Sequence, residues 1–158
     1  SSVYLGRWKN GFIGRLLLMV ENRYWLVIDA APGHIMESRF HTYADFTNGS
    51  DWVLLKRGQE EMMMTFASLG EGVMQESTGM PASPQEKTHI FRWISPKTKD
   101  NLHVTALNPG SEKLNLNLSK DVNGSFAVEL SGADGYNRTI RLTPDLKIKK
   151  DADTIVKK

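Results

Sequence analysis

Apolar and polar residues alternate along most of the chain, and turn residues recur about every ten positions. This pattern is typical of short antiparallel strands joined by tight turns. It is clearest in the C-terminal third, where Leu114, Leu116 and Leu118 alternate with Asn115 and Asn117. Such alternation requires one face toward a core and one toward water. We therefore expect strands at positions 102–106, 114–118, 126–130 and 136–142.

The N-terminal half also predicts strands, although its alternation is less regular. Branched and aromatic residues concentrate in two stretches that are separated by a tight turn at Glu21 and Asn22. The expected strands of this half are 12–20, 23–29, 52–57, 61–67, 72–76 and 88–94. Together the two halves predict an all-β antiparallel meander of about 8–10 strands, closed as a barrel or folded as a two-sheet sandwich.

Two segments do not follow the alternation. In residues 32–46, Met36, Phe40 and Phe46 share one face of a strand, whereas Ile35, Arg39 and Tyr43 fit one side of a helix. We favour a strand and keep one short helix open. Residues 78–86 contain two prolines and no periodicity, which predicts an irregular surface loop.

Length and charge narrow the class of protein. The 158 residues suit a single β domain at 1–146 followed by a basic tail at 147–158, whose natural interpretation is a solvated end. A net charge of +2 is too small and too scattered for a nucleic-acid partner. The longest apolar run, at 16–20, is too short to span a membrane. A start without Met or a signal peptide suggests a trimmed N-terminus and permits export. Because a secreted eukaryotic domain of this size would usually carry disulfides, we expect an exported protein of the bacterial periplasm or cell envelope.

Chemistry-bearing patterns are few. The sequence has no cysteine, which excludes disulfides, thiolate nucleophiles and cysteine-ligated metals. The four histidines are dispersed, and the usual nucleophile, metal and nucleotide-binding motifs are missing, so we expect no metal, no cofactor and no enzyme activity. The best catalytic alternative is a row of Glu37, His41 and Asp45, in which a carboxylate would raise the histidine pKa. The same row is what the solvent-facing side of a strand looks like.

A short motif near the N-terminus suggests a family. Gly6-Arg7-Trp8 stands just before the first long strand and resembles the Gly-X-Trp opening of lipocalins and the wider calycin barrels. The resemblance implies that Trp8 closes the floor of a barrel and that Arg141, or otherwise Arg138, covers it. It also implies an exported protein that binds a small hydrophobic molecule inside an eight-stranded barrel.

The residues expected to line such a cavity are large apolar side chains chosen by size and strand parity: Trp25, Phe40, Met62, Met64, Phe66, Phe91 and Trp93. Each also suits an ordinary core. Two other non-enzymatic functions stay open. One is a protein-interaction module that uses a loop or an outward Met63; the other is a carbohydrate-binding domain in which Trp52, Trp93 or Tyr136 stacks on sugar rings.

Overall fold

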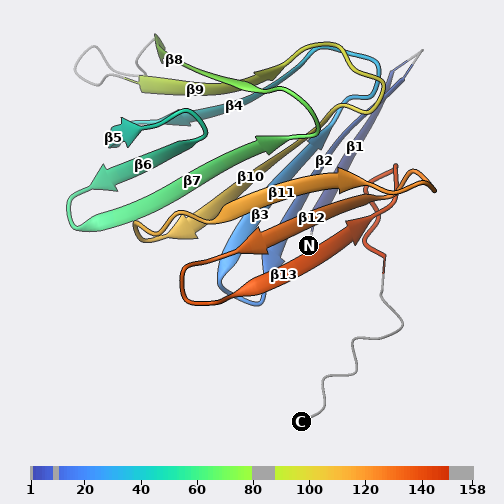
Figure 1. Ribbon diagram of the computed structural model, residues 1–158. Helices are drawn as coiled ribbons and strands as arrows, with labels where there is room; N and C mark the ends of the chain where they lie inside the picture. Colours follow the sequence, from blue (N-terminus) through green and yellow to red (C-terminus); the bar gives the residue numbers. More distant parts are fainter. Residues whose placement is uncertain (1, 9–10, 80–87, 150–158) are drawn as a thin grey trace.

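The computed structural model describes residues 2–8, 11–79 and 88–149, and these residues form thirteen β-strands and no helix (Figure 1). The strands in chain order are β1 (Ser2–Trp8), β2 (Gly11–Val20), β3 (Tyr24–Ala30), β4 (Met36–Thr42), β5 (Asp45–Asn48), β6 (Trp52–Arg57), β7 (Glu60–Ser68), β8 (Val73–Gly79), β9 (Thr88–Ser95), β10 (Leu102–Pro109), β11 (Asn115–Lys120), β12 (Phe126–Ser131) and β13 (Asn137–Leu142). The predicted all-β antiparallel class is confirmed.

The strands form three sheets. The large sheet has the order β1-β2-β3-β10-β7-β6-β5, and two three-stranded sheets have the orders β11-β12-β13 and β4-β9-β8. In the large sheet β1 and β5 are opposite edges that do not pair with each other, so the sheet is not a closed barrel. The barrel expectation is therefore wrong. The arrangement agrees with the sandwich alternative.

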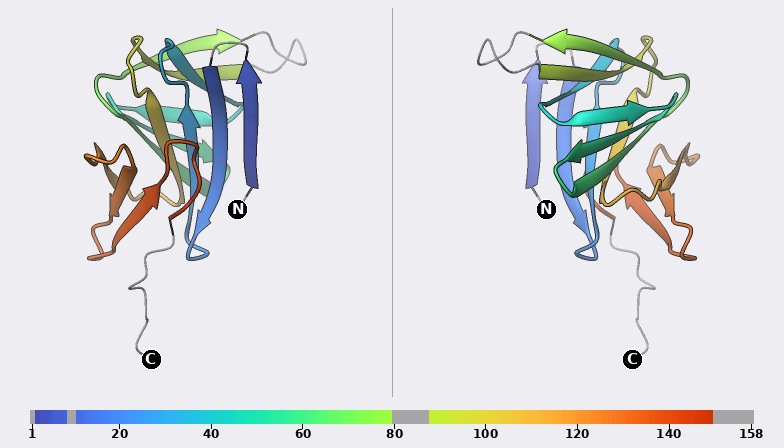
Figure 2. Two further views of the ribbon diagram at one scale, coloured as in Figure 1. Left: turned by 90° about the vertical axis from the view of Figure 1, so that its right-hand side faces the viewer. Right: turned by 90° about the vertical axis from the view of Figure 1, so that its left-hand side faces the viewer.

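The strand order departs from a simple meander at β10. This strand pairs with β3 on one side and β7 on the other, both antiparallel, although each partner lies far away in sequence. Its side chains at 102–106 are all buried. A strand that is buried on both faces needs a cover on each side, and the two small sheets supply them (Figure 2).

The first core lies between the large sheet and β11-β12-β13. Leu26, Ile28 and Val104 point from the large sheet toward Val128 and Leu142 of the small sheet, and all five are fully buried. These inward positions are every second residue of their strands. The C-terminal hairpins predicted from Leu114 to Leu142 therefore place their apolar face as expected.

The second core lies on the opposite face of the large sheet, under β4-β9-β8. Phe66 of β7 stacks on Trp93 of β9 at 5.7 Å between ring centroids, and it meets Phe40 of β4 edge-on at 5.8 Å. Because β7 is covered on both faces, Met63 and Met64 are both buried although they point in opposite directions. An outward, exposed Met63 is not observed.

Of the two segments that lack clear alternation, the structure describes the first fully and only the start of the second. Residues 36–42 and 45–48 are strands β4 and β5, which confirms the favoured interpretation; the short helix is absent from the described residues. The predicted turn at Glu21 and Asn22 joins β2 to β3. Most of the loop predicted at 78–86 lies outside the described residues, as do residues 150–158 of the basic tail.

The second core should carry much of the stability of the β4-β9-β8 sheet. Phe91 has no exposed surface, and its truncation in Phe91→Ala should lower the free energy of unfolding by about 3–5 kcal/mol. Val122→Ala, at a fully exposed turn residue, should change it by less than about 0.5 kcal/mol. Urea unfolding measures both. Equal losses in the two variants would contradict the assignment of this core.

Candidate functional site

A chain of polar groups, buried except for Arg15, crosses between the large sheet and β4-β9-β8. Arg15 of β2 holds both carboxylate oxygens of Asp29 on β3, at 2.6 and 2.8 Å. Ser38 of β4 donates to Asp29 Oδ2 at 2.6 Å, and its Oγ also lies 2.9 Å from Nδ1 of His103 on β10. Three strands of one sheet are thereby tied to a strand of the other.

The same chain continues on the other side of the imidazole. His103 Nε2 lies 2.7 Å from the Oγ of Ser95 on β9, and this hydroxyl donates to Asn101 Oδ1 at 2.6 Å. The amide nitrogen of Asn101 donates to the backbone carbonyls of His34 and Pro96. We call the whole set, from Arg15 to Asn101, the His103 network.

The hydrogens of the His103 network can be counted. The Asp29 carboxylate and Asn101 Oδ1 only accept, so Ser38 and Ser95 give their single hydrogens to them. Both ring contacts of His103 would then need a hydrogen on the ring, which only the charged imidazolium provides. Burial acts in the opposite direction and lowers the pKa of His103 to about 4, although Asp29 raises it. The ring is therefore neutral at pH 7, and one serine shares its hydrogen between two acceptors.

The His103 network has no opening to solvent at its centre. His103, Ser38, Ser95 and Asn101 are each about 1% exposed, so the described structure keeps them out of contact with solvent. A histidine between two serines has the ingredients of a nucleophile and base, but here it fixes the position of two sheets. Its contribution is structural.

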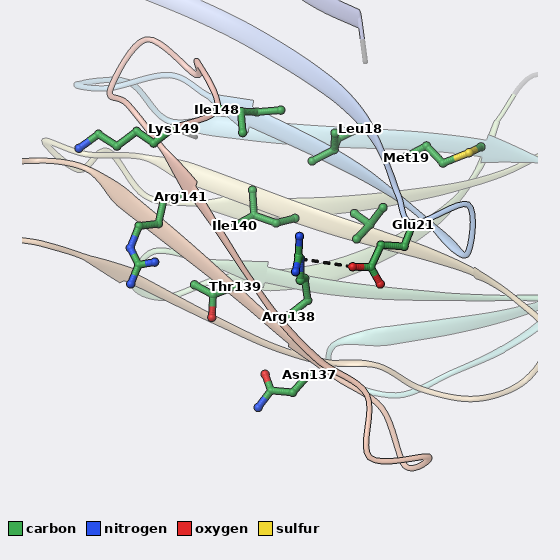
Figure 3. Close-up of a pocket in the computed structure, with 11 residues that line it drawn as sticks. Leu18, Met19, Glu21, Asn137, Arg138, Thr139, Ile140, Arg141, Ile148 and Lys149 are labelled. Atoms are coloured by element: carbon green, nitrogen blue, oxygen red, sulfur yellow. Dashed lines mark ion pairs between the residues drawn. The ribbon is translucent and has the colours of Figure 1, made fainter. Parts of the chain in front are cut away.

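A groove with access to solvent lies elsewhere, between the end of β2 and strand β13 (Figure 3). It encloses about 770 Å³, within the range of small-ligand pockets, which is roughly 300–1,000 Å³. The groove is lined by the following residues: Leu18, Met19, Val20, Glu21, Asn137, Arg138, Thr139, Ile140, Arg141, Ile148 and Lys149. We call it the β2–β13 groove.

The chain after β13 completes this groove. A turn closed by Thr143 N–H to the carbonyl of Lys147 reverses the direction, and Lys149 N–H then bonds the carbonyl of Arg141. Ile148 and Lys149 thereby lie beside the free edge of β13. The Lys149 ammonium donates to the hydroxyl of Ser125.

The lining of the groove combines positive charge with an apolar surface. Arg138, Arg141 and Lys149 supply three cations, and Glu21 is the one acid among the lining residues that the structure describes. Met19 and Ile148 are each about 40% exposed and supply apolar contact area. A groove whose lining combines cations with apolar side chains suits a ligand with negative groups on a carbon skeleton.

One end of the groove is held by a clamp of aromatic rings. The guanidinium of Arg23 lies over the rings of Tyr24 and Tyr136, at 5.1 and 4.8 Å from their centroids, and pairs with Asp134 at 2.7 Å. These contacts fix the β2–β3 turn against the β12–β13 turn. Burial, followed by the charge of Glu21, raises the pKa of Tyr136, so its hydroxyl stays protonated at neutral pH.

The residues predicted to line a ligand cavity lie in two different environments. Phe40, Met64, Phe66, Phe91 and Trp93 pack together in the second core. Trp25 and Met62 are instead each nearly 40% exposed. The predicted set is thus a core plus two surface residues.

The residues predicted to close a barrel, Gly6, Trp8 and Arg141, lie in two different sheets. Gly6 and Trp8 belong to β1 of the large sheet, and the positions of their side chains lie outside the described part of the structure. Arg141 lies on β13 of a different sheet and lines the β2–β13 groove. With no barrel, there is no floor for Arg141 to cover.

The row predicted as a catalytic alternative, Glu37, His41 and Asp45, lies on the protein surface. Glu37 pairs with Arg39 on β4, His41 is exposed further along the strand, and Asp45 begins β5. Among the residues that the structure describes, no three histidines or carboxylates gather as a metal site, and no helix is long and apolar enough to cross a bilayer.

The aromatic residues proposed for sugar stacking are poorly placed for it. Trp93 is buried, while Trp52 and Tyr136 are only partly accessible. Among the tryptophans whose side chains the structure describes, Trp25 is the most exposed. Together with its cross-strand neighbours Met19 and Leu107, Trp25 forms an apolar row. This row lies on the face of the large sheet that carries the second core.

Sequence reasoning missed the β2–β13 groove as a site. It is built from residues 18–21 and 137–149, which are more than a hundred positions apart. The signal in the sequence was the group of Arg138, Arg141 and Lys149, which we assigned to barrel closure and to a solvated tail.

Comparison with known proteins gives a fold but no family. No protein-family model matches the sequence, and no curated protein matches it. Among solved structures, heparinase III is similar with a TM-score of 0.70 and 14% identity, covering 89% of this chain and 25% of that one. This chain therefore spans about a quarter of the length of that neighbour.

Two structures of the heparan sulfate lyase HepC from Pedobacter heparinus, one of them a mutant, are similar as well. The mutant has a TM-score of 0.65 at 13% identity and is covered over 28% of its length; the other has a TM-score of 0.67 at 15% identity and is covered over 26%. They match 91% and 92% of this chain. These neighbours are lyases, and together with the open sheet edges they overturn the lipocalin resemblance.

The neutral state of His103 makes a prediction about pH. Because its pKa is about 4 when folded and near 6.5 when unfolded, the unfolded chain binds the proton first as the pH falls. This residue should therefore cost about 2 kcal/mol of folding stability between pH 7 and pH 5. Urea unfolding at both pH values should show this loss in the wild type and a smaller one in His103→Gln. Parallel pH dependence in the two proteins, or a charged His103 ring at pH 6 by NMR, would contradict it.

Proposed function

We propose that this chain is a polysaccharide-binding β-sandwich module of a lyase-type protein and that it holds an anionic polysaccharide of the heparan sulfate class in the β2–β13 groove. The observation that carries the proposal is that three cations, Arg138, Arg141 and Lys149, line the same groove as the apolar residues Met19 and Ile148. The module contributes binding. The chemical step is assigned to no residue of this chain.

The fold supports the choice of ligand class. The solved neighbours are named as heparinase III and heparan sulfate lyase, and nine-tenths of this chain follows their backbone. Each of those chains is far longer than the part matched here. A binding module beside a separate catalytic part is consistent with that difference in length.

The chemistry of the groove supports the same ligand. A sulfated polysaccharide carries sulfate and carboxylate groups on sugar rings that also have apolar faces. Guanidinium groups such as Arg141 bind sulfate-like anions through paired N–H donors, and Lys149 adds a compact positive charge. Met19 and Ile148 can contact the ring faces between the anions. The side-chain amide and hydroxyl of Asn137 and Thr139 add neutral donors and acceptors.

Removing the cations should weaken binding selectively. In the double variant Arg141→Gln with Lys149→Gln, the affinity for a heparin octasaccharide should fall about tenfold or more, which corresponds to about 1.4 kcal/mol or more. The loss should shrink as salt is raised, because salt screens exposed charges. Isothermal titration calorimetry at two salt concentrations measures both effects.

A matched control is available at the far side of the large sheet. Arg57 is an exposed arginine at the end of β6, several strands away from β2. Arg57→Gln should leave the affinity within about twofold. An equal loss in Arg57→Gln would show unspecific attraction of a polyanion to positive charge and would defeat the proposal.

The exposed tryptophan offers a competing location for the same ligand. Sugar rings stack on accessible aromatic side chains, and Trp25 is more than a third exposed. With binding in the β2–β13 groove, Trp25→Ala should retain the wild-type affinity. A large loss in Trp25→Ala, with the cation variant unchanged, would move the site to the face of the large sheet.

A further inference from the structure

We infer that Leu146 is a positioning residue of the β2–β13 groove, because its buried side chain holds the segment that brings Ile148 and Lys149 into the groove. We call this segment, residues 143–149, the strap. The inference rests on the proposed function and deepens it, since it names the residue on which the place of the Lys149 charge depends. Leu146 itself does not line the groove.

The turn at the start of the strap has leucine where glycine is usual. Its sequence is Thr143-Pro144-Asp145-Leu146-Lys147, and Leu146 N–H bonds the carbonyl of Thr143 at 3.0 Å. Pro-Asp-Gly is common in turns of this kind, because the residue after the aspartate takes a left-handed conformation. Leu146 occupies that place with a φ of 60°. A leucine is strained there, so its presence points to a role for the side chain.

The side chain of Leu146 is buried in the first core. It has no exposed surface, and it belongs to the cluster that contains Leu16 of β2 and Leu142 of β13. It also lies close to the backbone of β2, because a Cβ atom added at Gly14 would stand 3.1 Å from Leu146 Cδ1. The side chain of Leu146 therefore joins the strap to the large sheet.

The strap is also paired with its own sheet, but over a short length. Lys149 N–H bonds the carbonyl of Arg141 at 2.9 Å, and Leu142 forms a bridge with Ile148. Backbone pairing of so few residues at the edge of a sheet is only marginally stable in water. The burial of Leu146 therefore decides whether Ile148 and Lys149 stay beside β13 (Figure 3).

The position of the strap matters for the charge of the groove. The Lys149 ammonium donates to the Ser125 hydroxyl, and Lys149 lines the groove from this place. The attraction between an ammonium and a sulfate group falls with distance, so a strap that moves away from β13 weakens it. Ile148 would leave the groove together with Lys149. Leu146 should therefore contribute to affinity without contacting the ligand.

A double-variant cycle tests this role. Leu146→Gly relieves the strain of the turn and removes the buried side chain. We expect it to lower the affinity for a heparin octasaccharide about three- to tenfold, at least as much as Lys149→Gln does. Because both changes remove the same contribution, the double variant should bind within about twofold of Leu146→Gly. Titration calorimetry of the four proteins measures this. If the two single losses multiply in the double variant, Leu146 acts independently of Lys149 and the inference is overturned.

Hydrogen exchange without any ligand tests the position of the strap. The Lys149 amide is protected by its hydrogen bond to the carbonyl of Arg141, so in Leu146→Gly it should exchange about tenfold faster or more. Phe91→Ala lowers stability through the second core and should leave the exchange of this amide within about twofold. An unchanged Lys149 amide in Leu146→Gly, or equal acceleration in the two variants, would overturn the inference.

Two further variants separate positioning from overall stability. Leu146→Met keeps a long apolar side chain for the core and should retain the wild-type affinity within about twofold. Phe91→Ala, titrated at a temperature where it is folded, should do the same. A loss of affinity in Phe91→Ala equal to that in Leu146→Gly would mean that binding follows overall stability, against the inference.

The outcomes distinguish the two proposals. Failure of the wild type to bind the octasaccharide removes the proposed function and the inference with it. Binding that depends on Arg141 and Lys149 but is unchanged in Leu146→Gly retains the proposed function and overturns the role of Leu146.

Discussion

His103 and its hydroxyl partners join the large sheet to the β4-β9-β8 sheet through buried hydrogen bonds. The imidazole stands on β10, the strand that links the β1-β2-β3 half of the large sheet to the β7-β6-β5 half. Ser38 and Ser95 reach it from β4 and β9. Apolar packing is tolerant of small shifts, whereas buried hydrogen bonds are not, because an unpaired buried group costs free energy. The His103 network therefore sets the register between these layers.

With β10 fixed, the place of the β2–β13 groove follows from the other face. The first core packs β11-β12-β13 onto β2, β3 and β10, and the edge strand β13 comes to lie near the end of β2. The ring clamp at Arg23 then joins the two turns at that end. The groove is thus a consequence of how an edge strand meets a larger sheet, and its charges come from residues that the core does not use.

Local patterns predicted the elements of this fold better than their arrangement. The alternation of Leu114, Leu116 and Leu118 placed β11 and its partners, and Glu21 and Asn22 marked the β2–β3 turn. Alternation says which residues point inward but not which sheet a strand joins. The pairing of β10 with β3 and β7 is non-local, so a simple meander was the wrong topology.

The candidate site was less predictable for the same reason. Phe91 and Trp93 were correctly chosen as large inward residues, yet size and parity do not separate a packed core from a cavity wall. Arg138 and Arg141 were noticed but interpreted through a barrel. Recognition of the groove requires the contact between the end of β2 and β13, which no local pattern contains.

Mapping the bound polysaccharide on the folded chain tests the central claim most directly. Backbone amide shifts can be followed by NMR while a heparin octasaccharide is added. We predict that the largest shifts fall on Glu21, Arg138, Thr139, Arg141 and Lys149, with Trp25 and Arg57 unaffected. Shifts centred on Trp25 and its strand neighbours, or no saturable shifts at all, would contradict binding in the β2–β13 groove.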